Sequence, residues 1–202
     1  MAIVTCWLAE IHISLEESGI NMETFIKLKS MVHNPHFQEQ RQLALGNLDM
    51  NMIDAPIAEI IDAFAKLPFC FTQQCCFGHF LYAGQKDRHS IEPLPVSDSI
   101  ETIKYRIAYI AICIENSASG TNLLKSLKRI PAIDPKYIQF GCGEWFWKQQ
   151  VNSYALQVEP KRYMTKDTCL VDYNEALHIE NVKNQFFIKM NELTQKQLSI
   201  AS

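Results

Sequence analysis

One short segment near the middle of the chain concentrates side chains that could carry chemistry. It holds a hydroxyl, two amides, two thiols and an imidazole, on Thr72, Gln73, Gln74, Cys75, Cys76 and His79. Gly78 precedes the imidazole, and glycine permits a positive φ or the close approach of another group. A thiol beside an imidazole could act as an activated nucleophile. The competing interpretation is a polar hairpin whose cysteines pack inward.

The cysteines favour reduced thiols over a metal centre. The chain has seven, an odd number, and no C-x-x-C pair, so the usual zinc-chelating spacing is absent. Cys75 and Cys76 are adjacent, and on a strand their side chains point to opposite faces. This predicts one buried and one presented thiol. A zinc or iron site on Cys70, Cys75, Cys76 and His79 is the less favoured alternative, and we predict no metal.

Composition limits the classes of protein to consider. The chain has 202 residues, 48% hydrophobic residues, 20% charged residues and a net charge of −3 with a pI near 6.1. We therefore expect one globular domain without a global basic field for nucleic acid. Short apolar runs and an N-terminus that lacks a basic segment predict a cytoplasmic protein with no membrane association. No P-loop, GxGxxG, GxSxG or HExxH motif occurs.

A well-marked helix leads into the central segment. Ile57, Ile60, Ile61, Phe64 and Leu67 recur at helical spacing over residues 55–67. Asp54 is expected to cap this helix through its side chain, and Pro56 fits its first turn. Aromatic residues at 69, 71, 80 and 82 predict two short strands on either side of a polar turn at 72–79.

The remaining pattern predicts an α+β domain in which one mixed sheet is covered by helices 55–67, 118–129 and 172–198. A long loop at 84–100 precedes a central strand at 105–114, and Ser117 is expected to cap the helix that follows. Further strands are expected at 137–140 and 152–158, with a strand-like aromatic pattern within 141–147. Residues 1–46 read as an N-terminal helical cover on a 47–202 body. The cover has helices at 3–15 (or a strand at 10–15), 22–32 and 37–45.

The second half of the chain repeats the order of elements in the first: helix, proline, aromatic strand, Gly/Cys turn and aromatic strand. This suggests two related units in one sheet. The turn of the second unit, residues 141–147, includes Glu144 and Trp145 and could stack a base, although core packing is the competing interpretation. We expect this turn and the 72–79 segment to form one pocket for a small molecule or nucleotide.

The segment 53–79 resembles the tRNA wybutosine-synthesizing protein 3 family. That family has an Ile/Val-Asp before a helix of this length, as Ile53-Asp54 stands here, and then a Thr-Thr/Ser-Ser-Ser-Cys-Ser-Gly-Arg segment. Residues 72–79 align with it without a gap, and Thr72, Cys76 and Gly78 match. His79 stands where the family has arginine. Looser similarity in the order of elements extends over about residues 40–198.

The resemblance implies a methyltransferase that uses S-adenosylmethionine and acts on a tricyclic guanine in phenylalanine tRNA. Asp54, Cys76 and His79 would then be catalytic, and the cofactor would lie against Thr72, Gln73, Gln74, Gly78, Glu144 and Trp145. In that case Cys76 should be accessible and more reactive than Cys113, and protonated His79 could hold an anion. The alternative is a non-catalytic ligand-binding or interaction protein that retains the fold.

Overall fold

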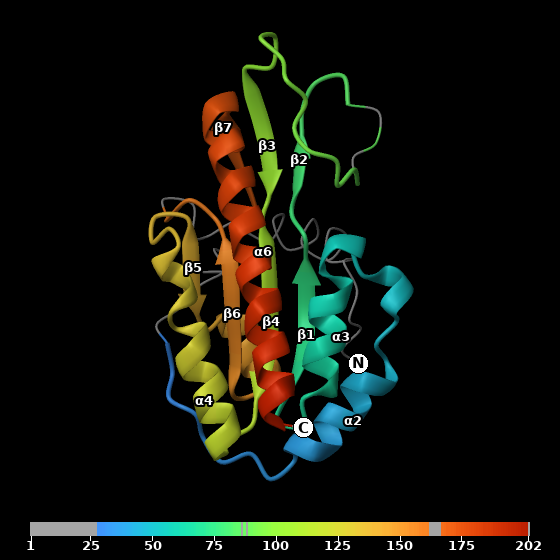
Figure 1. The fold of residues 1–202 in the computed structure, drawn as a ribbon, viewed down its shortest axis with the longest axis vertical. Helices are drawn as coiled ribbons and strands as arrows, with labels where there is room; N and C mark the ends of the chain where they lie inside the picture. The colour runs from blue at the N-terminus through green and yellow to red at the C-terminus, as the bar shows by residue number, and fades with distance from the viewer. Residues whose placement is uncertain (1–27, 86, 88, 162–166, 202) are drawn as a thin grey trace.

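Helices and antiparallel sheets make up the computed structural model, which describes residues 28–85, 87, 89–161 and 167–201 (Figure 1). The predicted α+β class and the long C-terminal helix are confirmed. Among the described residues, no helix combines the length and apolar character needed to cross a membrane.

The strands form two sheets where one mixed sheet was expected. The larger sheet has the order β1-β4-β6-β5 and the smaller has the order β2-β3-β7. Every pairing between the described strands is antiparallel. The strands are β1 (Cys70–Cys76), β2 (His79–Leu81), β3 (Thr102–Arg106), β4 (Ala108–Ile114), β5 (Ile138–Gly141), β6 (Ser153–Val158) and β7 (Thr168–Asp172). β7 was not predicted from the sequence.

Two chain segments pass from one sheet to the other at the same level. β1 leads through Phe77 and Gly78 into β2, and β3 leads through Ile107 into β4 (Figure 1). The single strand predicted at 105–114 is thus divided, because the Ile107 N–H leaves the ladder and donates to the Asp167 carbonyl at 3.0 Å. We call Phe77, Gly78 and Ile107 the sheet junction. The C-terminal part of the prediction holds, since β4 is central in the larger sheet.

Helices cover the face of the larger sheet that carries the main core. The helices α3 (Ala58–Lys66), α4 (Ala118–Leu127) and α6 (Tyr173–Ala201) lie across it, and α6 extends along both sheets (Figure 1). Apolar side chains from these helices, from the 3-10 turn before α3 and from β4 are almost fully buried. Each contributes roughly 1.5–3 kcal/mol by leaving water. They include Ile57, Ile61, Phe64, Ile110, Ile112, Leu123, Leu127, Ile179 and Phe186.

The predicted helices are largely confirmed, with shifted ends. The described helices are α2 (Phe37–Gly46), α3 (Ala58–Lys66), α4 (Ala118–Leu127), α5 (Glu144–Gln149) and α6 (Tyr173–Ala201), with 3-10 turns η1 (Met50–Met52), η2 (Ala55–Ile57) and η3 (Ile130–Ala132). Ser117 caps α4, because its hydroxyl accepts from the Gly120 N–H at 3.2 Å.

Parts of the described N-terminal region and of the second half differ from the predictions. Residues 28–32, expected at the end of a 22–32 helix, are not helical, and the expected 3–15 element lies outside the described residues. The aromatic strand expected within 141–147 is wrong, since residues 144–149 form helix α5. The two related units also differ. β5 pairs with β6 in one sheet, whereas β1 and β2 belong to different sheets.

Candidate functional site

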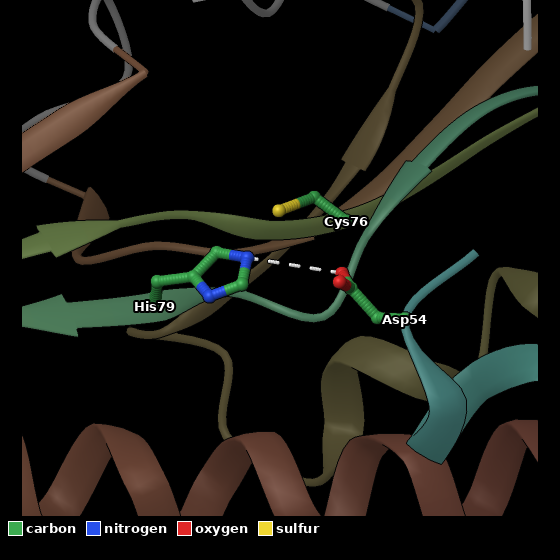
Figure 2. A group of neighbouring side chains, drawn as sticks. All are labelled: Asp54, Cys76 and His79. Carbon is green, nitrogen blue, oxygen red and sulfur yellow. Dashed lines mark ion pairs between the residues drawn. The ribbon is translucent and has the colours of Figure 1, made fainter. Parts of the chain in front are cut away.

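Three of the predicted site residues converge at the sheet junction. Asp54 immediately precedes η2, Cys76 ends β1 and His79 begins β2. A carboxylate oxygen, the thiol and an imidazole nitrogen from these residues all lie within 4.8 Å of one another. Figure 2 shows the three side chains directed toward one another from these separate segments. This convergence is the strongest functional feature of the described residues.

Asp54 acts differently from the predicted helix cap. Its side chain makes no capping hydrogen bond to the 3-10 turn that follows. Its Oδ2 instead accepts from the Phe77 N–H at 2.8 Å. Phe77 lies between two sheets, so its N–H needs an acceptor outside the ladders. The carboxylate therefore ties the start of η2 to the junction and faces His79, with 3.8 Å between Oδ2 and Nε2.

Cys76 is buried, which corrects the expectation of an accessible thiol. Cys75 and Cys76 pair with Ile110 and Tyr109 respectively, so they do point to opposite faces of β1. The relative exposure is 4% for Cys75 and 1% for Cys76, so both thiols are covered. The Cys76 Sγ accepts from the Gly78 N–H at 3.4 Å. Rapid labelling of Cys76 in the native protein is therefore no longer expected.

His79 is also buried, with 3% relative exposure. Its Nδ1 lies 3.3 Å from the Ser90 carbonyl oxygen. A carbonyl only accepts, so Nδ1 carries the proton in this contact. Nε2 is then the ring nitrogen that faces Asp54 and can take up or release a proton toward that carboxylate.

Lys183 completes the site and was missed by sequence reasoning. It is 3% exposed on α6 and donates to the Gly78 carbonyl at 3.4 Å. Its Nζ lies 4.1 Å from the ring centroid of Phe77 and 4.9 Å from that of Phe80. The sequence did contain an indication that Lys183 is buried, because it lies four residues after Ile179 on the predicted buried stripe.

Burial lowers the pKa of Lys183 to about 8, although the neighbouring acidic groups of Glu180, Cys76 and Asp54 act in the opposite direction. The folded protein therefore releases this proton at lower pH than the unfolded chain, whose lysine titrates near 10.5. Since the unfolded chain binds more protons in this window, stability rises as pH increases from 8 to 10.5.

We expect this rise to contribute about 3 kcal/mol to the free energy of unfolding and to disappear in Lys183→Met. Urea unfolding across this pH range measures it. Lys189→Met, an exposed lysine on the same helix, serves as the control and should keep the wild-type slope. If the free energy of unfolding changed equally with pH in wild type and Lys183→Met, Lys183 would not be a buried ammonium that titrates in this range.

The predicted cofactor residues of the central segment lie in a strand and not in a turn. Thr72, Gln73 and Gln74 belong to β1, whose pairing with β4 shifts between Thr72 and Gln74 and leaves Gln73 as a bulge. The segment continues the ladder, so only Phe77 and Gly78 connect the strands. Within the described part of the chain, Thr72 Oγ1 and Gln73 Oε1 are buried and have no hydrogen-bond partner.

Glu144 and Trp145 lie on a different element from the convergent residues. Both are on α5, which follows β5, and β5 and β1 are the two edges of the larger sheet. Glu144 pairs with Lys148 at 3.0 Å near the surface, and Trp145 is 36% exposed. Phe146 of the same helix packs against Ala111 and Ala155 on the sheet.

The cysteine-rich metal centre considered from the sequence is not found with the ligands predicted for it. Cys70 donates to the Phe64 carbonyl at 3.6 Å, and burial raises the pKa of its thiol to about 12. Asp54, Cys76 and His79 are instead the donors that could ligate an ion. The buried Lys183 ammonium beside them would oppose a cation.

Comparisons with known proteins were made by sequence and by structure. No family model and no curated protein matches the chain. Two structures of the PH1069 protein, from Pyrococcus horikoshii and its strain OT3, are each 12% identical, with TM-scores of 0.46 and 0.45. They cover 83% and 86% of this chain and 96% and 97% of theirs. A hypothetical protein from Aeropyrum pernix is 10% identical, with a TM-score of 0.38, covering 71% of this chain and 96% of its own. At these TM-scores the similarity supports no conclusion about this chain.

Proposed function

We propose that the sheet junction is a group-transfer site that takes S-adenosylmethionine as methyl donor and a nucleotide, in RNA or free, as acceptor. The observation that carries the proposal is the convergence of Asp54, Cys76 and His79 within 4.8 Å. Asp54, Cys76 and Gly78 also occupy positions at which the sequence resembles the wybutosine-synthesis family. Residues separated in sequence thus meet where that resemblance expects a site.

Unpaired polar atoms of the central segment could bind these two ligands. Thr72 Oγ1 and Gln73 Oε1 are buried polar atoms of β1 that lack a hydrogen-bond partner within the described ranges. They would hold polar groups of a ligand, since leaving such atoms unpaired costs about 1–3 kcal/mol each. S-adenosylmethionine supplies an electrophilic methyl group when bound.

Side chains of this protein would accept the proton that the acceptor releases in this reaction. An acceptor atom that carries a proton would have to release it on receiving the methyl group. His79 Nε2, facing Asp54 Oδ2 at 3.8 Å, would receive it, and the carboxylate would stabilise the resulting imidazolium. Lys183 would favour a ligand that carries negative charge near Gly78.

Asp54→Asn tests the proposal without removing the contact to Phe77, because an amide oxygen can still accept that N–H. We expect methyl transfer from radiolabelled S-adenosylmethionine to bulk tRNA to fall about 100-fold or more. Asp62→Asn, on the exposed side of α3 and paired with Lys66, is the matched control and should retain full transfer. Equal transfer by both variants would contradict the proposed role of Asp54.

A second candidate function is non-catalytic ligand binding. It is favoured by the burial of Cys76 and His79, which are 1% and 3% exposed. Calorimetry with S-adenosylmethionine, followed by a tRNA binding assay, separates the two functions. Binding of either molecule without transfer would favour this second function, and binding of neither would exclude the proposed transfer.

A further inference from the structure

A row of polar side chains crosses the second face of the larger sheet, the face opposite α3, α4 and α6. Cys76 of β1 pairs with Tyr109 of β4, Tyr109 with Gln157 of β6, and Gln157 with Gln139 of β5. Side chains of directly paired residues point to the same face and lie about 4.5–5.5 Å apart at Cβ. These four residues, together with Glu159, are called the polar row below.

Hydrogen bonds connect parts of the polar row. Gln157 Nε2 donates to the Glu159 Oε2 at 2.7 Å, and Glu159 directly follows the end of β6, two residues after Gln157. At the other end, the Tyr109 hydroxyl donates to Gln74 Oε1 at 3.4 Å. The row therefore begins at Cys76, in the candidate site, and ends beside Glu159.

Two polar atoms in the row lack partners. Gln139 Nε2 and Glu159 Oε1 are buried without a hydrogen-bond partner among the residues that the structure describes. The residues are 8% and 0% exposed. Each such atom costs the fold about 1–3 kcal/mol. The two side chains flank Gln157, so they present adjacent unpaired groups on one surface.

We infer that the polar row binds an uncharged planar heterocycle through its hydrogen-bond acceptors, with Gln139 Nε2 and the Glu159 carboxyl group as the donors. This inference rests on the proposed function, since it names the part of the acceptor nucleotide that the same site recognises. The heterocycle lies against Tyr109, and its reactive edge points toward Cys76 and the junction.

The chemistry of the row selects this ligand class. Gln139 Nε2 can only donate. Burial, reinforced by the charge of Asp167, raises the pKa of Glu159 to about 8, despite the opposing hydrogen bond from Gln157. Its carboxyl group is therefore mostly protonated at neutral pH, and Oε1 can donate while Oε2 accepts from Gln157. The row contains no lysine or arginine, so a phosphate would lack a counter-charge there.

Tyr109 supplies the flat surface and the route of entry. It is only partly buried, unlike Gln139, Gln157 and Glu159. Tyr109 and Phe146 of α5 pack on the small side chains of Ala111 and Ala155 on this face of the sheet. A planar ring would stack on the part of Tyr109 that stays exposed, and stacking of a base on an aromatic side chain contributes about 1–3 kcal/mol.

The test uses uridine, cytidine and 1,3-dimethyluracil as probes, each titrated alone by calorimetry. Dimethyluracil retains two carbonyl acceptors and has no N–H donor. We expect all three to bind, and Gln139→Met to weaken each about tenfold through loss of one hydrogen bond. Gln139→Met should also keep or raise the melting temperature, since it removes an unpaired buried amide. Gln85→Met, which changes another buried unpaired amide outside the row, is the matched control and should leave binding unchanged.

The pH dependence provides a readout that a structural role would not give. Binding should weaken as pH rises past the Glu159 pKa of about 8. Glu159→Gln keeps a donor at that position, so its binding should be retained and lose this dependence. Failure of all three probes, or equal binding by wild type and Gln139→Met, would overturn the inference. If the probes bind and the variants and pH change this binding as expected, but no methyl transfer occurs, the ligand site at the polar row is supported and the proposed function is rejected.

Discussion

Replacing Gly78 with alanine is expected to destabilise the protein by about 3–5 kcal/mol, from backbone strain and overpacking combined. Gly78 has φ of +85°, a conformation that residues with a Cβ rarely adopt. A Cβ built there would lie 2.8 Å from Ala108 Cβ and 2.9 Å from the Ala108 backbone nitrogen. The neighbour is the first residue of a central strand, so it cannot move aside without disturbing β4.

Gly84→Ala separates the two causes. Gly84 has a nearly identical φ of +86°, but a Cβ there would meet nothing within 4 Å. This variant should lose only the backbone contribution, about 1–2 kcal/mol. Urea unfolding of both variants measures the difference. A loss at Gly78 no larger than at Gly84 would mean that the two crossing segments can separate at little cost, and that the junction is not a rigid support for the site.

The elements predicted best from the sequence are those with strong local signals. The region of α3, expected over residues 55–67, shows a regular apolar stripe, and α4 shows a stripe with Ser117 as cap. Both signals depend only on residues within a few turns, so no knowledge of the tertiary fold is needed. The α+β class follows from such elements together with the alternating strands.

The divided strands could not be predicted because their division is set by distant partners. Residues 105–114 read as one apolar strand, yet Ile107 bonds to Asp167, sixty positions further along. The aromatic residues of 145–147 likewise fit strand propensity, but they form helix α5 between two paired strands. Propensity is a weak guide where tertiary contacts decide.

The candidate site was predicted in part. Asp54, Cys76 and His79 were singled out by residue type and by the family resemblance, and they do converge. The role of Asp54 was predicted wrongly. An argument from helix capping considers only nearby backbone groups, and the actual partner is the distant Phe77 N–H. Lys183 was missed, since its contact with Gly78 spans 105 positions of sequence.

A large pH effect on stability between pH 4.5 and 8 is expected from Glu159. Burial raises its pKa from 4.5 to about 8, with Asp167 adding to the rise and Gln157 opposing it. Between these pH values the folded protein keeps a proton that the unfolded chain releases. The free energy of unfolding should therefore fall as pH rises from 4.5 to 8, and the contribution of this group is about 4–5 kcal/mol.

Glu159→Gln should abolish this fall, because a neutral amide has the same shape and does not titrate. The variant and wild type should differ least near pH 4.5, and the variant should be the more stable by several kcal/mol above pH 8. Denaturant unfolding at a series of pH values gives the comparison, and Glu192→Gln, an exposed carboxylate on α6 paired with Lys189, is the control that should follow wild type. If the wild-type and Glu159→Gln curves remained parallel, the carboxyl group would already be ionised in the folded protein. Oε1 would then accept hydrogen bonds and could not donate them, and the ligand of the polar row would have to present an N–H.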